Sequence, residues 1–210
     1  MIVQTKRREE VAKVRRESII DAAERVFFRK GYRHATVDEI VKEAEYSKRT
    51  VYSYVNSKES MYDAVALRAL AKQYEYMSRD VKGIDALSDM KNVLKNAVDF
   101  ALFCPGYTHI LINYHVRAKA SPDSILREVY DNDGKVFGIL LDILERGVQE
   151  GVFRKDKDAK FLGMYLSSTF VGIVDMLTHK KHYMEISTGV TPEQYMQNML
   201  DMTIDALLAK

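Results

Sequence analysis

The sequence contains a single cysteine, Cys104, which excludes a disulfide within the chain and a zinc site built from several thiolates. It also has no tryptophan, and only three prolines and ten glycines among 210 residues. Because helix-breaking residues are scarce and apolar residues recur at helical spacing, the sequence predicts an almost entirely α-helical protein.

Long apolar segments are missing as well. The first ten residues lack the apolar core of a signal peptide. The most apolar later stretch, residues 163–177, is too short to cross a bilayer and contains Asp175. These features predict a cytoplasmic protein that makes no contact with a membrane.

Neither sign of charge dominates, but the charges are unevenly placed. Residues 1–58 hold 14 Lys or Arg against 9 Asp or Glu, a net charge of +5. The remaining 152 residues hold 18 against 21, a net charge of −3. This asymmetry favours an N-terminal part that meets a polyanion, although many ordinary solvated surfaces carry a similar excess.

Residues 36–58, TVDEIVKEAEYSKRTVYSYVNSK, begin with the pattern of a short amphipathic helix. Thr36 and Glu39 are spaced as a capping box, which predicts that this helix starts at Thr36. Apolar residues then recur on one face at i, i+3, i+4 and i+7: Val37, Ile40, Val41 and Ala44.

A second short helix is predicted after a tight turn at Glu45 and Tyr46, with Ser47 as its cap. Val51 and Val55, four residues apart, would face the first helix. The other side chains of the second helix would point away from the packed side: Lys48, Arg49, Thr50, Tyr52, Ser53 and Tyr54. Exposed basic, hydroxyl and aromatic groups on the second of two short helices are typical of a helix-turn-helix module that reads DNA.

The segments on either side of this motif also predict helices. Residues 6–30 form a long helix that Gly31 ends, and Ser57 caps a later helix with Lys58 in its first turn, where backbone N–H groups attract phosphate. The leading segment 6–17, KRREEVAKVRRE, is charged all round. It is either a frayed, solvated helix end or a basic arm that touches phosphates or the minor groove.

The run from residue 19 to 65 resembles the DNA-binding domain of the TetR family of bacterial transcriptional regulators. The matching features, in order, are the Ala23–Phe27 pair, Gly31-Tyr32, Thr36-Val37, Ile40, Ala44, Ser47, Thr50-Val51-Tyr52, Tyr54 and Ser57-Lys58-Glu59. The resemblance implies that Thr36, Tyr52 and Lys58 bind phosphates and that residues 48–54 enter the major groove. Two departures bear on the tilt of the recognition helix: the family usually has Gly where this chain has Glu45, and often Phe where it has Val55.

Beyond residue 56 the sequence predicts six further helices, in the number and order of the family's larger domain. We expect them at about 57–79, 85–103 and 107–118, from Ser121-Pro122 to Gly151 with a kink at Asp133-Gly134, from an Asp156 cap to about Thr178, and from Thr191 onward. The predicted fold is therefore all-α, with about nine helices. A three-helix helix-turn-helix DNA-binding domain spans 1–56, and a larger helical bundle for effector binding and dimerisation spans 57–210.

Two apolar surfaces of this bundle are candidates for a homodimer interface. Small residues recur in the penultimate helix and an apolar stripe follows the last one: Gly163, Ser167 and Gly172, then Met196, Met199, Leu200 and Ile204. Both stripes could instead close the core of the monomer. The resemblance implies dimerisation through a four-helix bundle built from these helices.

The middle helices offer candidates for a pocket that binds a small-molecule effector: Phe100, Phe103, Tyr107, Asn113, Tyr114, Phe137, Tyr165 and Thr169. Aromatic residues at helical spacing are usually core, so each could equally be a packing residue. The resemblance implies an effector site among these helices but does not assign the residues that line it.

Motifs for metal binding and catalysis are weak or missing. His179, His182 and Glu185 could share one side of a helix, but His182 and Glu185 fall in KKHYMEISTG, directly after His179, which reads as a polar helix end or loop. We find no glycine-rich phosphate cradle and no nucleophile elbow, so we predict no enzyme, no metal and no cofactor.

The favoured interpretation is a homodimeric repressor, released from a pseudo-palindromic DNA operator by a small-molecule effector. A helical-bundle enzyme or metal-binding protein with an incidental basic N-terminus is the alternative, and a DNA-binding dimer without an effector is a third. The sequence indicates neither the operator nor the effector.

Overall fold

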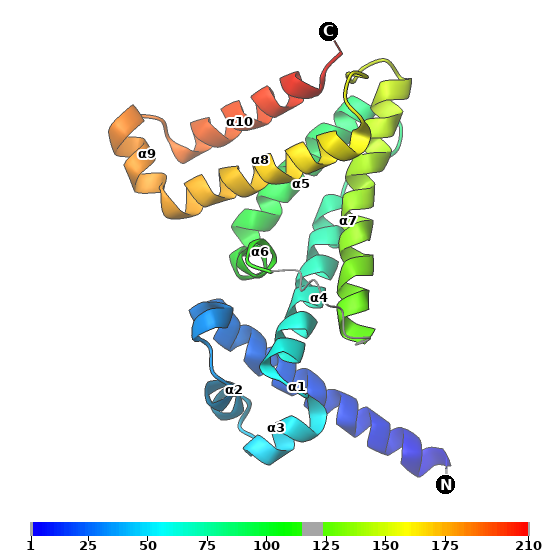
Figure 1. The fold of residues 1–210 in the computed structure, drawn as a ribbon, viewed down its shortest axis with the longest axis vertical. Coiled ribbons are helices and arrows are strands. Elements are labelled where there is room, and N and C mark those ends of the chain that lie inside the picture. Colours follow the sequence, from blue (N-terminus) through cyan, green and yellow to red (C-terminus); the bar gives the residue numbers. More distant parts are fainter. Residues whose placement is uncertain (1, 115–123, 210) are drawn as a thin grey trace. The chain divides into compact units, whose positions relative to one another are not determined.

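The computed structural model describes residues 2–114 and 124–209 of the chain. These residues form ten α-helices and one isolated β-bridge, so the predicted all-α fold is confirmed (Figure 1). The helices are α1 (Ile2–His34), α2 (Val37–Ala44), α3 (Lys48–Tyr54), α4 (Lys58–Met77), α5 (Ala86–Phe103), α6 (Pro105–Ile112), α7 (Ser124–Gln149), α8 (Ala159–His179), α9 (Lys181–Thr188) and α10 (Pro192–Leu207).

The chain divides into two compact units. The head unit comprises Met1–Ala71 and Gly106–Asn132, and the bundle unit comprises Lys72–Pro105 and Asp133–Lys210. The head unit thus contains α6 in addition to the helix-turn-helix segment, and α4 begins in one unit and ends in the other. This division follows packing; the predicted functional boundary at residues 56 and 57 stays a prediction.

In the head unit, α1, α2 and α3 pack around one apolar core (Figure 1). The capping box of Thr36 and Glu39 is present, and Ser47 caps α3 by accepting from the Thr50 N–H, as predicted. Glu45 has φ of 57°, the left-handed conformation expected at the turn. A residue with a Cβ there costs on the order of 1 kcal/mol relative to glycine, which the surrounding core can offset.

Two long-range contacts fix other helices to α1. Arg68 of α4 pairs with Glu17, Asp21 and Glu24 at 2.6, 2.8 and 3.2 Å. Burial alone would lower the pKa of Arg68, but the three carboxylates raise it above its ordinary value. Tyr107 of α6 donates to the Glu24 carboxylate at 3.0 Å, so one acidic face of α1 holds both α4 and α6.

A chain of aromatic rings completes the contact between α6 and the head core. Tyr62 lies edge-on to Phe27 and stacks on Tyr114, with centroid distances of 5.2 and 5.7 Å. Tyr114 donates to buried Asp63 at 2.8 Å. Burial raises the pKa of Tyr62 to about 12, and its hydroxyl donates to the Ile110 carbonyl.

The bundle unit has its own core, and a buried ion pair lies at one edge of it. Asp89 of α5 accepts from the Lys82 and Gly83 N–H groups at 2.8 and 2.9 Å and from the Arg146 guanidinium of α7 at 2.7 Å. Elsewhere in the bundle unit, the backbone of 152–154 pairs with that of 207–209. The Arg154 N–H donates to the Leu207 carbonyl, and the Ala209 N–H donates to the Val152 carbonyl.

Several predicted helix boundaries are wrong. The N-cap of α8 is Asp158, whose carboxylate accepts from the Phe161 N–H; Asp156 instead forms an ion pair with Arg154. The segment around His182 forms the separate short helix α9 rather than a helix end or loop, and α6 ends at Ile112. The predicted break at Gly31 is confirmed, because its φ of 69° and ψ of 167° are non-helical; a further helical turn follows it to His34. We find no kink at Asp133-Gly134 in α7, and the predicted Ser121-Pro122 start lies outside the described residues.

The apolar stretch 163–177, predicted to be too short to cross a membrane by itself, lies within a longer helix. This stretch belongs to α8, whose 21 residues are long and apolar enough to span a bilayer by length and composition. Helices that pack in soluble proteins meet the same criterion. Only 22% of the apolar window is buried, so α8 presents an uncovered apolar face.

Gly147 of α7 lies where the helix meets the buried ring of Phe153. A Cβ at this position would lie 2.0 Å from Cδ2 of Phe153, which is 2% exposed. We expect Gly147→Ala to lower the free energy of unfolding by about 1–3 kcal/mol, because the ring has no free space to enter. Gly138→Ala in the same helix is the control; a Cβ there meets nothing within 4 Å, so helix propensity should raise stability by about 0.5–1 kcal/mol. Urea unfolding followed by circular dichroism checks both, and equal effects would contradict the packing argument.

Candidate nucleic-acid interface

The second helix of the motif, α3, turns one face inward and one outward. Val51 and Val55 are 0% and 4% exposed and belong to the head core, as predicted. Lys48, Arg49, Tyr52 and Ser53 are exposed, whereas Thr50 and Tyr54 are half-buried. The prediction that all six side chains point away from the packed side is therefore wrong for Tyr54, which packs against the head core. The half-burial of Thr50 does not contradict it, because its hydroxyl lies against Ser47 at the cap.

The hydroxyl groups of α3 are engaged within the helix. Thr50 Oγ1 lies 2.8 Å from Ser47 Oγ at the cap, and Ser53 Oγ donates to the Thr50 carbonyl at 2.6 Å. These bonds stabilise the first turns and fix the orientation of both side chains. Lys48, Arg49 and Tyr52 thus remain as the long exposed side chains of the helix, and Arg49 can donate a bidentate pair to a guanine edge.

Lys48 is paired within the chain. Its Nζ lies 2.7 Å from Asp38 Oδ1 of α2, and both side chains are largely exposed. The Asp38 carboxylate raises the pKa of Lys48 by accepting its hydrogen bond. A phosphate that approaches Lys48 must therefore compete with Asp38.

We expect Asp38→Asn to increase the affinity for a 30-base-pair duplex of random sequence about two- to fivefold, because an exposed ion pair is worth a few tenths to 1 kcal/mol. Fluorescence anisotropy at low salt measures the change. Asp99→Asn, which releases Lys95 from a similar exposed pair of 2.6 Å in the bundle unit, is the control and should leave binding unchanged. A gain of equal size in both variants would show that only net charge matters.

The other predicted phosphate ligands lie at helix N-termini. Thr36 begins α2, and its hydroxyl accepts from the Glu39 N–H at 3.3 Å. Lys58 begins α4 after the Ser57 cap, and its Nζ lies 4.4 Å from the centroid of the Tyr32 ring. Because the N-terminal turns also present unpaired N–H groups and positive dipole ends, both positions suit a phosphate.

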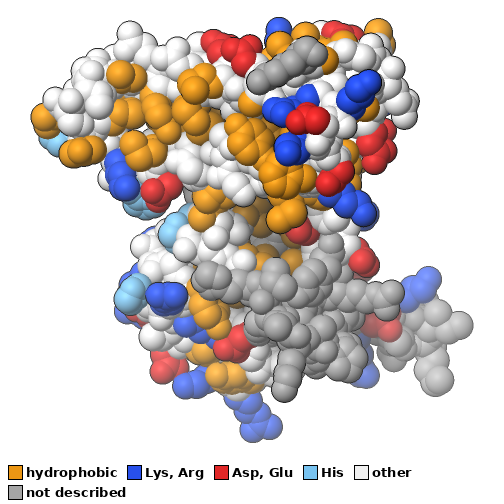
Figure 2. All heavy atoms as spheres, turned by 45° about the horizontal axis from the view of Figure 1, so that its top comes forward, with side chains coloured by type: hydrophobic (Ala, Val, Ile, Leu, Met, Phe, Trp, Pro, Cys, Tyr) orange, Lys and Arg blue, Asp and Glu red, His pale blue; other side chains and the backbone are white. Residues whose placement is uncertain are grey.

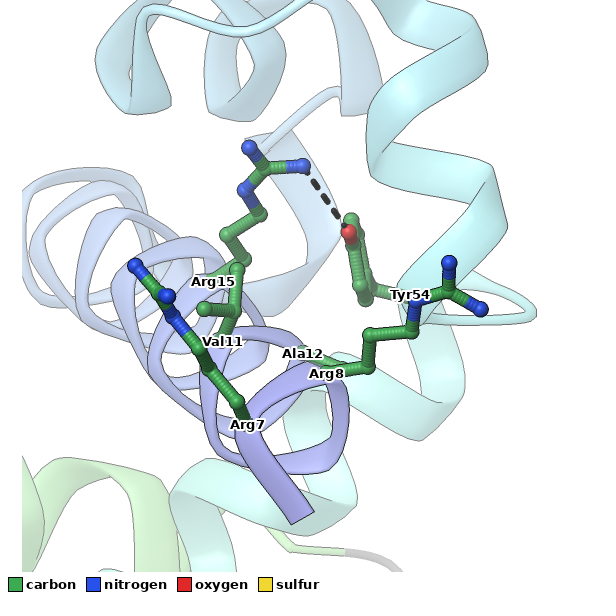
Figure 3. A pocket seen from close by; sticks show the side chains of 6 residues that line it. All are labelled: Arg7, Arg8, Val11, Ala12, Arg15 and Tyr54. Carbon is green, nitrogen blue, oxygen red and sulfur yellow. Dashed lines mark hydrogen bonds between the residues drawn. The ribbon is translucent and has the colours of Figure 1, made fainter. Parts of the chain in front are cut away.

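A hollow that was not predicted from the sequence lies between the start of α1 and the end of α3. It is lined by Arg7, Arg8, Val11, Ala12, Arg15 and Tyr54 and has a volume of about 540 Å³ (Figure 3). Arg15 donates to the Tyr54 hydroxyl at 3.2 Å. The seven-residue spacing of Arg8 and Arg15 puts both on one helix face, a signal that the sequence contains.

The candidate dimer residues are divided between core and surface. Gly163 is buried against the Phe137 ring, and Leu200 and Ile204 pack in the core of the bundle unit. Ser167 and Gly172 are exposed, and Met196 and Met199 are half-buried.

Hydrophobic side chains gather over the part of the bundle unit that carries α8, α9 and α10 (Figure 2). The large exposed ones are Phe161, Met164, Tyr165 and Val171 of α8, Tyr183 and Ile186 of α9, and Met202 of α10. In α8, the exposed Phe161, Met164, Tyr165 and Gly172 share one helix face. This uncovered face suits contact with another apolar surface.

The candidate effector residues belong to both units. Tyr107, Asn113 and Tyr114 lie in the head unit, where Asn113 donates to the His109 carbonyl and the two tyrosines make the bonds described above. The rest lie in the bundle unit: Phe100 and Phe137 in its interior, Thr169 half-buried, Phe103 and Tyr165 exposed. Their role in a pocket stays a prediction.

Within the described parts of the chain, no three His, Cys, Asp or Glu side chains gather as ligands for a metal ion. His179 Nδ1 lies 3.0 Å from Asp175 Oδ1 of the preceding turn of α8. His182 and Glu185 belong to the separate helix α9.

Comparison with known proteins gives four findings. The family described as "Bacterial regulatory proteins, tetR family" matches residues 19–65. The HTH-type transcriptional repressor NicS of Pseudomonas putida is 28% identical over 147 residues, which cover 67% of this chain and 66% of that protein. A tetR-family regulatory protein from Rhodococcus RHA1 has a similar fold, with a TM-score of 0.74 at 17% identity over 93% of this chain and 98% of that one. AibR, in complex with isovaleryl coenzyme A and operator DNA, gives a TM-score of 0.67 at 16% identity, over 90% and 97% of the two chains.

Proposed function

We propose that this chain is a transcriptional regulator of the bacterial TetR family and, more specifically, a homodimeric cytoplasmic repressor that a small-molecule effector releases from its operator. The observation that carries the proposal is the exposed face of α3, where Lys48, Arg49 and Tyr52 project from a helix held by Val51 and Val55. The repressor function of NicS, which is similar over two thirds of this chain, supports the same direction of regulation.

DNA recognition in this proposal combines base and phosphate contacts. Arg49 and Lys48 reach base edges in the major groove, assisted by Ser53 and Tyr54. Thr36, Thr50, Tyr52 and Lys58 bind phosphates on either side and fix the register of α3. The N-termini of α2 and α4 support this assignment because they present N–H groups beside Thr36 and Lys58.

A homodimer is proposed because one seven-residue helix buries too little surface for tight binding. Two copies related by a two-fold axis would read a pseudo-palindrome with half-sites about 34 Å apart. The uncovered apolar face of α8, which includes Gly172, is the proposed contact between copies, together with Met196 and Met199 of α10. Pairing of these helices would remove from water an apolar surface that the single chain leaves exposed.

The effector is proposed to act by linkage. A small molecule that prefers a geometry in which the two heads are wrongly spaced must weaken operator binding by its differential affinity for the two states. Helix α4 runs from the head unit into the bundle unit, so a tilt of α4 is the proposed link. AibR binds isovaleryl coenzyme A and operator DNA, which supports effector control in this fold.

Selection of bound sequences from a random duplex pool, at a stated salt concentration, tests the function. A repressor dimer should enrich one pseudo-palindromic sequence, and a thermal-shift screen that includes coenzyme A thioesters should find a compound that raises the melting temperature and releases that DNA. Failure to enrich any sequence would overturn the proposal. Release of DNA with an unchanged distance between spin-labelled heads would exclude the α4 tilt.

A further inference from the structure

We propose that the hollow between α1 and α3 is a phosphate-binding site that holds the DNA backbone beside the groove entered by α3. This inference rests on the proposed DNA-binding function and extends it to Arg7, Arg8 and Arg15, which the family resemblance from residue 19 onward does not include. The ligand is a phosphodiester of duplex DNA.

The hollow is built by two helices of the head unit. Arg8 and Arg15, two helical turns apart, line it from α1, and Tyr54 lines it from the last turn of α3 (Figure 3). The Arg15 guanidinium donates to the Tyr54 hydroxyl at 3.2 Å, which leaves the hydroxyl hydrogen free to donate in turn to a phosphate oxygen. Hydrogen bonding to Tyr54 raises the pKa of Arg15, so this charge persists in free protein.

Charge is segregated around α1. Glu17, Asp21 and Glu24 recur at i, i+4 and i+7, and Arg68 of α4 pairs with all three. Glu10 lies two helical turns before Glu17 and therefore on the same face. Glu9 lies about 100° around the helix axis from Arg8. Arg68 thus engages the acidic face inside the head unit, whereas the face that carries Arg8 and Arg15 lies on the opposite side of α1.

A phosphate fits this arrangement better than the alternatives. Guanidinium groups bind phosphate oxygens with two parallel N–H bonds, and three of them line a hollow of about 540 Å³ with no carboxylate among its lining residues. Tyr54 is continuous with α3, so a backbone bound here would run past the end of the recognition helix. If the start of α1 were only a frayed, solvated helix end, its arginines would not need to lie on one common face.

The test compares two double variants of the full chain that remove the same charge from opposite faces of α1. Arg8→Ala/Arg15→Ala alters the hollow, and Lys6→Ala/Lys13→Ala, also seven residues apart, alters the other side. The probe is a fluorescent 30-base-pair duplex of random sequence, titrated between 50 and 200 mM salt. Each lost phosphate contact reduces the slope of log K against log salt by about 0.9, so the arginine pair should reduce it by about 1.8 for each bound head. Between 50 and 200 mM salt, the affinity of wild-type protein should therefore fall by a factor about twelvefold larger per bound head than that of Arg8→Ala/Arg15→Ala.

Each outcome decides the matter. Lys6→Ala/Lys13→Ala should keep the wild-type slope. Arg8→Lys/Arg15→Lys should recover most of that slope, because lysine restores both positive charges. Equal slopes for both alanine variants, or a wild-type slope in the arginine variant, would overturn the inference while DNA binding itself stands. Failure of wild-type protein to bind DNA at any salt would instead overturn the proposed function. Unchanged circular dichroism of all variants shows that folding is not the cause.

Discussion

Simultaneous replacement of Lys48, Arg49 and Tyr52 by alanine is expected to abolish sequence-specific DNA binding and leave the fold intact. Each side chain is exposed on α3, so its removal should change the free energy of unfolding by no more than about 0.5 kcal/mol. The base contacts of Lys48 and Arg49 are worth about 1–3 kcal/mol each and Tyr52 adds a phosphate contact, so the triple change should weaken operator binding on the order of 10²–10⁴-fold. Anisotropy with the selected duplex measures the loss.

The control removes the same number of positive charges and of tyrosines from the bundle unit. Lys91→Ala, Lys157→Ala and Tyr74→Ala together delete two cations and one exposed tyrosine that lie outside the head unit. This variant should bind the selected duplex like wild type. If both triple variants lost affinity equally, α3 would not be the recognition helix; if neither did, the assignment of the interface would be wrong.

Asp89→Ala is expected to destabilise the protein by about 3–5 kcal/mol, because it leaves the guanidinium of Arg146 partly buried without its main partner. It also removes the acceptor of the Lys82 and Gly83 N–H groups. Asp142→Ala is the control, since Asp142 bonds the same arginine at 3.1 Å but is 68% exposed and should cost less than about 1 kcal/mol. Urea unfolding of the two variants at one protein concentration distinguishes them, and similar losses would refute the role of burial.

The contribution of Asp89 should depend on pH in one direction. Burial alone would raise its pKa, but the two N–H groups and Arg146 hold the pKa of Asp89 below its ordinary value. A carboxylate with a lowered folded-state pKa stabilises the protein fully above its unfolded pKa of about 4, and this stability is lost as pH falls through the folded pKa. The difference in unfolding free energy between wild type and Asp89→Ala should therefore be constant from about pH 5 to 7 and shrink below about pH 4. A difference that grew in acid would contradict this ion pair.

Features determined by a few neighbouring residues were predictable from sequence. The capping box at Thr36, the helix start at Thr191 and the buried pair Val51 and Val55 are present as expected. The prediction of Asp156 as the helix cap was wrong because Asp156 and Asp158 are both near the helix start. Asp156 pairs with Arg154 and Asp158 caps the helix, a division that periodicity does not reveal.

Contacts between residues far apart in the chain were not predictable. Arg68 meets Glu17 across 51 positions, and Tyr114 meets Asp63 across the same separation. The pairing of Arg15 with Tyr54 likewise depends on how α1 crosses α3, so the sequence left the role of the basic segment open. The seven-residue spacing of Arg8 and Arg15 is enough to predict that they share one helix face. It does not predict that Tyr54 of α3 lies against that face.

The paired backbone of 152–154 and 207–209 bears on how the protein is best produced. Leu207 is fully buried, and the Ala209 N–H donates to the Val152 carbonyl. An affinity tag fused directly to this end of the chain would therefore strain an ordered, hydrogen-bonded segment. A glycine- and serine-rich spacer of about ten residues would leave that segment undisturbed. A tag at the other end would add chain next to Arg7 and Arg8, so binding assays are best performed with the spaced C-terminal tag or after its removal by a protease.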